Sequence, residues 1–125
     1  MGTISLRIAG FFLAIVSMLA VIPARQQAPA AELVMFEREG CVYCSRWNND
    51  IAPAYMASKE AKLAPLRRHD LAKGQPVGIK LAAPVRFTPT FVLVDNGAER
   101  GRITGYFDNA IFWGMLEKLV QPLKH

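Results

Sequence analysis

The stretch Glu39-Gly40-Cys41-Val42-Tyr43-Cys44-Ser45-Arg46-Trp47 contains the only two cysteines of the chain. It follows an apolar run, Leu33 to Phe36, that is typical of a central strand covered on both faces. It also opens a helical pattern, and two cysteines three positions apart on a first helical turn can form a disulfide. A strand, a C-x-x-C motif and a helix in this order indicate a dithiol redox centre.

The cysteine pair could instead be a structural disulfide or half of a zinc site. A disulfide that closes so short a loop adds little stability. A tetrahedral zinc site needs further ligands, and the sequence contains no second cysteine pair to supply them. Both alternatives are therefore weaker than the redox hypothesis.

The two cysteines are expected to differ in their surroundings. Cys41 is predicted at the N-terminus of the helix, where a thiolate is favoured and the pKa of a cysteine falls below about 8.5. An apolar stripe runs from Cys44 through Trp47 to Ile51 and Tyr55. We therefore expect Cys41 to be exposed and Cys44 to be shielded in the core.

The first thirty residues are typical of a secretory signal peptide. Arg7 precedes an apolar stretch from Ile8 to Ile22, and Ala28-Pro29-Ala30 offers small residues for a signal peptidase. This apolar core of about fifteen residues is short for a membrane span, which needs about twenty. We predict a signal peptide over residues 1–30 and one domain over residues 31–125 in the periplasm. The alternative is an uncleaved N-terminal segment that anchors the protein to the inner membrane.

Charge and composition narrow the classes of function. The formal net charge of +5 falls to +3 without the leader residues Arg7 and Arg25. The other charges are scattered, and neither a Gly-rich phosphate loop nor a basic stripe with interleaved aromatic residues occurs, which argues against nucleic acid as a partner. His69 and His125 are the only histidines, so no metal site and no cofactor are expected. A metal or haem carrier remains a third class, and a metal-content measurement would test it.

The domain is predicted to be α/β, with a βαβ unit followed by a ββα unit. Pro53 should kink or divide the first helix near Ala52, and Asn96-Gly97 predicts a tight hairpin. Asp108 can cap the last helix, in which Gly114 suggests a close packing contact. The other predicted elements are a short helix from Ser58 to Ala64, strands from Leu66 to Leu71, Phe91 to Val94 and Arg100 to Thr104, and a short helix or irregular crossover from Val77 to Ala83. Along the last helix an apolar stripe is formed by Ile111, Phe112, Met115, Leu116, Leu119 and Val120.

These residues resemble the thioredoxin-like family over nearly the whole predicted domain. The matching parts are Leu33 to Phe36, Cys41-Val42-Tyr43-Cys44, Thr88-Pro89-Thr90 and Gly105-Tyr106. Three stretches look closest to small exported thioredoxins of the SoxS-like kind: Trp47 to Tyr55, Ala64 to Arg68 and Arg86 to Phe91. The resemblance implies a central mixed sheet with flanking helices and a cis bond between Thr88 and Pro89.

Two positions depart from the family pattern. Met35 stands where thioredoxins usually carry a buried aspartate, and Gly40 stands where they carry a tryptophan. Glu37 or Glu39 could supply a carboxylate instead, although as loop residues they are expected to be solvated. Tyr43 resembles the tyrosine of glutaredoxins and of periplasmic disulfide isomerases, but the sequence identifies no charged glutathione site beside it.

The resemblance implies an exported thiol–disulfide oxidoreductase that acts on protein disulfides, as a monomer and a periplasmic reductant. Cys41 would be the nucleophile and Cys44 the resolving thiol, while Thr88 and Pro89 would bind the substrate. Reuse would need an electron donor, expected to be a membrane protein. The alternative is a redox-sensing adaptor of the same fold, in which the cysteine pair is a switch without turnover.

Overall fold

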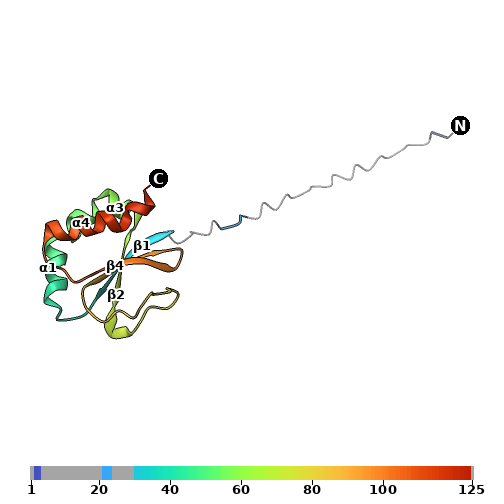
Figure 1. Ribbon diagram of the computed structural model, residues 1–125. Helices are drawn as coiled ribbons and strands as arrows, with labels where there is room; N and C mark the ends of the chain where they lie inside the picture. Colours follow the sequence, from blue (N-terminus) through green and yellow to red (C-terminus); the bar gives the residue numbers. More distant parts are fainter. Residues whose placement is uncertain (1, 4–20, 24–29, 125) are drawn as a thin grey trace.

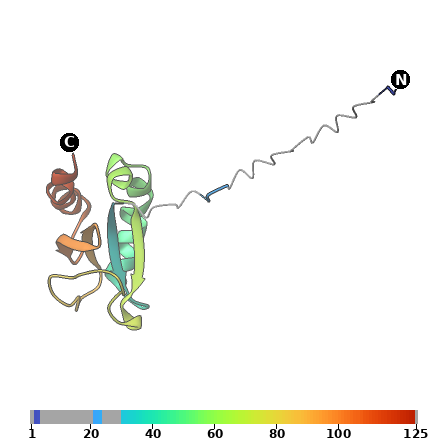
Figure 2. The same ribbon diagram turned by 90° about the vertical axis from the view of Figure 1, so that its right-hand side faces the viewer.

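Four strands form a mixed sheet in the order β2-β1-β3-β4 in the computed structural model, which describes residues 2–3, 21–23 and 30–124 (Figure 1). The strands are β1 (Ala31–Glu37), β2 (Leu66–Asp70), β3 (Thr90–Asp95) and β4 (Ala98–Thr104). β1 and β2 run side by side and parallel (Figure 2), and the other two pairs of neighbours are antiparallel. The predicted βαβ and ββα units are therefore confirmed.

The helices begin and end largely where the local sequence predicts. They are α1 (Val42–Asp50), α2 (Ala52–Met56), α3 (Lys59–Leu63), α4 (Asn109–Val120) and the 3₁₀ helices η1 (Leu71–Lys73) and η2 (Gln121–Leu123). The break between α1 and α2 falls at Ile51, because Pro53 can stand only in the first turn of a helix. Asp108 accepts a hydrogen bond from the backbone N–H of Ile111 at 2.8 Å and caps α4.

Both faces of the sheet are covered, as predicted for its central strand β1. Leu33 and Met35 lie in one apolar cluster with residues of the α-helices, and Val34 and Phe36 lie in a second. In Figure 1 the labelled helices lie on one side of the sheet, and the yellow crossover loop lies on the other. The second cluster is completed by Leu71, Val85, Val92 and Val94. The alternation of side chains along β1 therefore explains why the strand is apolar at every position from Leu33 to Phe36.

The segment between η1 and β3 is an irregular crossover, which decides between the two predicted possibilities. Glu99 of β4 anchors it, because its carboxylate accepts a hydrogen bond from the N–H of Ala82 at 2.7 Å. Arg102 donates to the same carboxylate at 2.6 Å and to the carbonyl of Ala83 at 2.7 Å. The hydrogen bond from Arg102 is the main reason why the pKa of Glu99 lies below its usual value.

The apolar stripe of the last helix is only partly buried, and the close contact expected at Gly114 is absent. Ile111 and Met115 are exposed and Leu119 is half-buried, whereas Phe112, Leu116 and Val120, spaced four apart, are buried. No atom would lie within 4 Å of a Cβ added at Gly114, so this glycine makes no close contact. The close approach occurs at Gly101 of β4, where a Cβ would lie 2.7 Å from Cδ1 of Leu119.

The predicted signal peptide falls almost entirely on residues outside those that the structure describes. The same holds for His125 at the other end of the chain. Within the described ranges, no helix is both long enough and apolar enough to cross a membrane. The choice between a cleaved leader and an anchor therefore remains a prediction.

Candidate active site

Cys41 and Cys44 form a disulfide at the start of α1. Cys41 is the N-cap residue, and the loop reaches it through Gly40, whose φ of +76° lies in the region that favours glycine. The Cα atoms of the two cysteines are 5.2 Å apart. Cys44 is 4% exposed, as predicted, whereas Cys41 is only partly exposed because it packs against the edge of the main core.

Aromatic packing fixes α1 against the sheet. The buried ring of Trp47 lies 4.9 Å from the ring of Phe91 in β3 and 5.7 Å from that of Phe112 in α4, centroid to centroid. Further along the predicted stripe, Ile51 and Tyr55 are also fully buried. The hydroxyl of Tyr55 donates a hydrogen bond to the carbonyl of Ala64, and burial, followed by the charge of Glu60, raises its pKa. Trp47 thus holds α1 against the sheet, and Tyr55 holds the following helix α2.

The buried position that carries an acid in many thioredoxins carries a thioether here. Met35 is fully buried, and it lies opposite Arg68 in the β1–β2 ladder. Nη1 of Arg68 is 3.5 Å from the Met35 sulfur and 2.8 Å from the Glu37 carboxylate. Glu37 therefore ends β1 in a partly exposed ion pair. The prediction that it is a solvated loop residue is wrong. Glu39 is exposed in the turn before Cys41.

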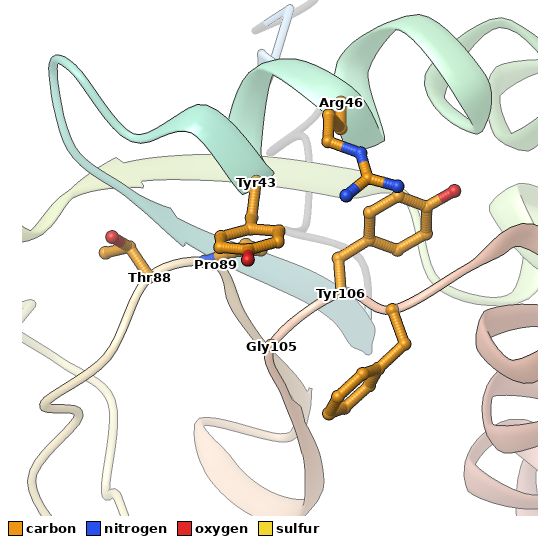
Figure 3. Close-up of a pocket in the computed structure, with 7 residues that line it drawn as sticks. Tyr43, Arg46, Thr88, Pro89, Gly105 and Tyr106 are labelled. Atoms are coloured by element: carbon orange, nitrogen blue, oxygen red, sulfur yellow. The ribbon is translucent and has the colours of Figure 1, made fainter.

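A pocket of about 340 Å³ lies beside the first turn of α1 (Figure 3). It brings Tyr43, the residue before Cys44, together with Thr88 and Pro89, which are 45 or more positions away in the chain. The peptide bond between Thr88 and Pro89 is cis, as the family resemblance implies. The remaining lining residues are Arg46, Gly105, Tyr106 and Phe107.

Three residues of the pocket, Arg46, Tyr106 and Phe107, have no role predicted from the sequence. In Figure 3 the side chains of Tyr43 and Arg46 descend from α1 toward the two segments that carry Pro89 and Tyr106. The guanidinium carbon of Arg46 lies 5.7 Å from the centroid of the Tyr43 ring. In the sequence, the spacing of three positions on one helix could have indicated that these two side chains are neighbours. No sequence signal joins Phe107 to either.

Tyr106 is held by a contact that spans 56 positions of the chain. Its hydroxyl donates a hydrogen bond to a carboxylate oxygen of Asp50, the last residue of α1, at 3.0 Å. Burial of the phenol and this bond raise the pKa of Tyr106. The bond links the end of the disulfide-bearing helix to the segment between β4 and α4. One wall of the pocket is fixed in this way.

Comparisons with known proteins agree with this arrangement. Residues 19–120 match the family model described as a thioredoxin-like domain. The periplasmic thioredoxin SoxS from Paracoccus pantotrophus is 45% identical, with 73% of this chain and 96% of that chain covered and a TM-score of 0.70. No curated protein matches the chain.

Two more distant structures share the fold. A Malassezia sympodialis thioredoxin is 17% identical, with 73% of this chain and 78% of that chain covered and a TM-score of 0.56. A thioredoxin-fold protein from Helicobacter pylori is 20% identical, with 77% and 81% covered and a TM-score of 0.53. At these identities the likeness concerns the fold alone.

The chain belongs to the thioredoxin-like family. The family and the Cys41–Cys44 disulfide define it as a thiol–disulfide oxidoreductase. Within the family it is similar to the periplasmic thioredoxin SoxS, which confirms the resemblance found in the sequence.

Proposed function

We propose that the chain is an exported reductase of protein disulfides, with Cys41 as the nucleophile and Cys44 as the resolving thiol. The observation that carries this assignment is the unequal exposure of the two cysteines of one disulfide. Cys41 is partly exposed at the N-cap of α1, whereas Cys44 is 4% exposed. A target disulfide can therefore approach Cys41 first.

The reaction consists of two exchanges of sulfur bonds. The Cys41 thiolate attacks one sulfur of the target disulfide, which forms a mixed disulfide and releases the other target sulfur as a thiolate that takes up a proton. Cys44 loses its proton and attacks the Cys41 sulfur. This step forms the Cys41–Cys44 disulfide and releases the second target thiol. Two electrons pass to the target, and the chain is left oxidised.

The pocket beside the disulfide offers a place for the target chain. Thr88 lies two residues before β3 and outside the β-ladder, so its backbone can pair with an extended target segment. Pro89 has no N–H to donate. Tyr43 is 53% exposed and lines the same pocket. Thr88 and Pro89 thus act as substrate-binding residues, next to an aromatic contact from α1.

The remaining proposals concern the location of the protein, its oligomeric state and its electron donor. We assign residues 1–30 as a signal peptide and residues 31–125 as the domain that acts in the periplasm as a monomer. The similarity to a periplasmic thioredoxin supports this location. Turnover needs a donor of two electrons and two protons that reduces the Cys41–Cys44 disulfide, and we propose a membrane-bound dithiol protein. N-terminal sequencing of protein from a periplasmic extract should give a start near Ala31. A start at the first residues in the membrane fraction would indicate an anchor.

Reduction of insulin disulfides in the presence of dithiothreitol tests the activity. The purified protein should accelerate insulin precipitation, and Cys41→Ser should abolish the acceleration. Equilibration with glutathione buffers then gives the reduction potential, which should lie closer to the value of about −270 mV for thioredoxin than to about −120 mV for a strong oxidant. Redox-dependent binding of a partner without any turnover would contradict the proposal and favour an adaptor.

A further inference from the structure

The arginines of the domain divide into two groups according to their partners. Four arginines of β2 and β4 each lie within 4.0 Å of a carboxylate oxygen, in the pairs Arg67–Glu32, Arg68–Glu37, Arg100–Asp95 and Arg102–Glu99. In the described part of the chain, Arg38, Arg46 and Arg86 have no such partner, and all three are exposed. They lie in the loop before Cys41, on α1 and in the loop before Thr88. The unpaired arginines therefore lie on the segments that carry Cys41, α1 and Thr88.

Arg46 is the one charged residue among the seven that line the pocket beside the disulfide. Among the described residues, no carboxylate oxygen lies within 4.0 Å of an Arg46 nitrogen, and the carboxylates of Asp50 and Asp108 have partners elsewhere. Asp50 accepts from the Tyr106 hydroxyl at 3.0 Å, and Asp108 accepts from the N–H of Ile111 at 2.8 Å. Neither carboxylate lines the pocket. The guanidinium group thus keeps donors available for a ligand.

The walls of the pocket favour a charged contact. Tyr43, Tyr106 and Pro89 supply apolar surface around Arg46, and Phe107 is 73% exposed at the rim. Apolar walls remove water from a bound group, which strengthens a charge-assisted hydrogen bond. The planar guanidinium can hold both oxygens of a carboxylate. A volume of about 340 Å³ is at the small end of ligand pockets, which hold about 300–1,000 Å³, and it suits one side chain.

We propose that this pocket is a subsite for an aspartate or glutamate of the target polypeptide, and that Arg46 determines the specificity for it. The acidic residue lies next to the target cysteine that Cys41 attacks, because Tyr43 and Arg46 both descend from the helix that Cys41 caps (Figure 3). The inference rests on the proposed thiol–disulfide exchange. It adds a preference among targets that the redox chemistry does not require.

Three disulfide-bonded peptides that differ at one position test the subsite. The position beside the attacked cysteine carries Glu, Gln or Lys, and stopped-flow fluorescence gives the rate constant of reduction by the reduced full chain. We expect the Glu peptide to react roughly tenfold faster than the Gln peptide, since a charge-assisted contact contributes about that factor. The Lys peptide should react slowest. Added salt should reduce the spread.

Variants at three arginine positions distinguish binding in the subsite from a general electrostatic attraction by the positively charged surface. Arg46→Gln should reduce the Glu-to-Gln rate ratio to about one, and Arg46→Lys should retain part of it because an ammonium lacks the planar fork. Arg38→Gln removes an unpaired arginine that does not line the pocket, and Arg100→Gln removes a paired one on β4. Both should keep the ratio. Circular dichroism checks that every variant is folded.

Each possible result decides the inference. Equal rates for the three peptides would overturn the subsite and leave the proposed function intact, whereas no reduction of any peptide would overturn both. A loss of the ratio in Arg38→Gln equal to that in Arg46→Gln would replace the subsite by long-range attraction. If only a glutathionylated peptide is reduced at a rate that depends on Arg46, the pocket binds a small thiol. That result would overturn the assignment to a polypeptide.

Discussion

The backbone N–H of Cys44 donates a hydrogen bond to Sγ of Cys41 over a distance of 3.1 Å. The sulfur of Cys41 thus stands in the place of a helix-capping oxygen at the N-terminus of α1. A negative charge is stabilised at this end of a helix by the unpaired N–H groups of the first turn. The same contact therefore favours a thiolate on Cys41 once the disulfide is reduced.

The first prediction concerns the different roles of the two sulfurs. Cys44→Ser should leave a nucleophile that captures targets but cannot resolve them, so mixed disulfides should accumulate in cells. Non-reducing gels after acid quenching would show these complexes. Cys41→Ser should trap few or none, because Cys44 is buried.

Alkylation of the reduced protein gives a second view of the same difference. Iodoacetamide below about pH 7 should label Cys41 about tenfold faster than Cys44, since the thiolate is the reactive form. Peptide mass spectrometry measures the two rates. Equal labelling, together with an absence of trapped complexes, would leave only a structural disulfide.

Removal of the Tyr106 hydroxyl should weaken the link between α1 and the segment before α4. Tyr106→Phe deletes the donor to Asp50, and the free energy of unfolding should fall by about 1 kcal/mol. Urea denaturation measures the loss, and Asp50→Ala in the Tyr106→Phe background should add little to it. Tyr43→Phe is the matched control, because its exposed tyrosine makes no such bond to the described residues. Fully additive losses would show that the bond is not made.

The stability that Glu99 contributes by anchoring the crossover should depend on pH. Because the folded pKa of Glu99 lies below its unfolded value, its charge stabilises the fold above about pH 4.3 and is lost as pH falls further. Glu99→Gln should therefore lower the free energy of unfolding by about 1–2 kcal/mol at about pH 7, and by less at low pH. Denaturation at several pH values tests this. Glu117→Gln, exposed on α4, should show no comparable change, and an equal effect of both variants would contradict the prediction.

Two glycine substitutions should change stability in opposite directions. Gly114→Ala places a methyl group in open space on α4 and should raise the free energy of unfolding by about 1 kcal/mol, because alanine favours a helix. Gly101→Ala should lower it by about 1 kcal/mol, since Leu119 must leave its position. Chemical denaturation measures both. A gain at Gly101 would show that Leu119 moves without cost.

The sequence by itself determined the features that depend on neighbours along the chain. The disulfide at the start of α1, the break at Pro53 and the cap at Asp108 each follow from residues within one helical turn. The hairpin at Asn96 follows from its tolerance of a positive φ, which is 50° here. The central position of β1 was also predictable, because a strand covered on both faces is apolar throughout.

Only the tertiary structure decided which distant segments meet. The pocket joins Arg46 to Pro89 and Tyr106, the ion pair of Glu37 with Arg68 depends on the register of β1 and β2, and Gly101 meets Leu119 through the packing of α4 on β4. The periodicity of α4 marked Ile111 and Met115 as apolar but did not show how narrow its contact with the sheet is. Such contacts depend on register and packing between segments far apart in the chain, and no local pattern records them.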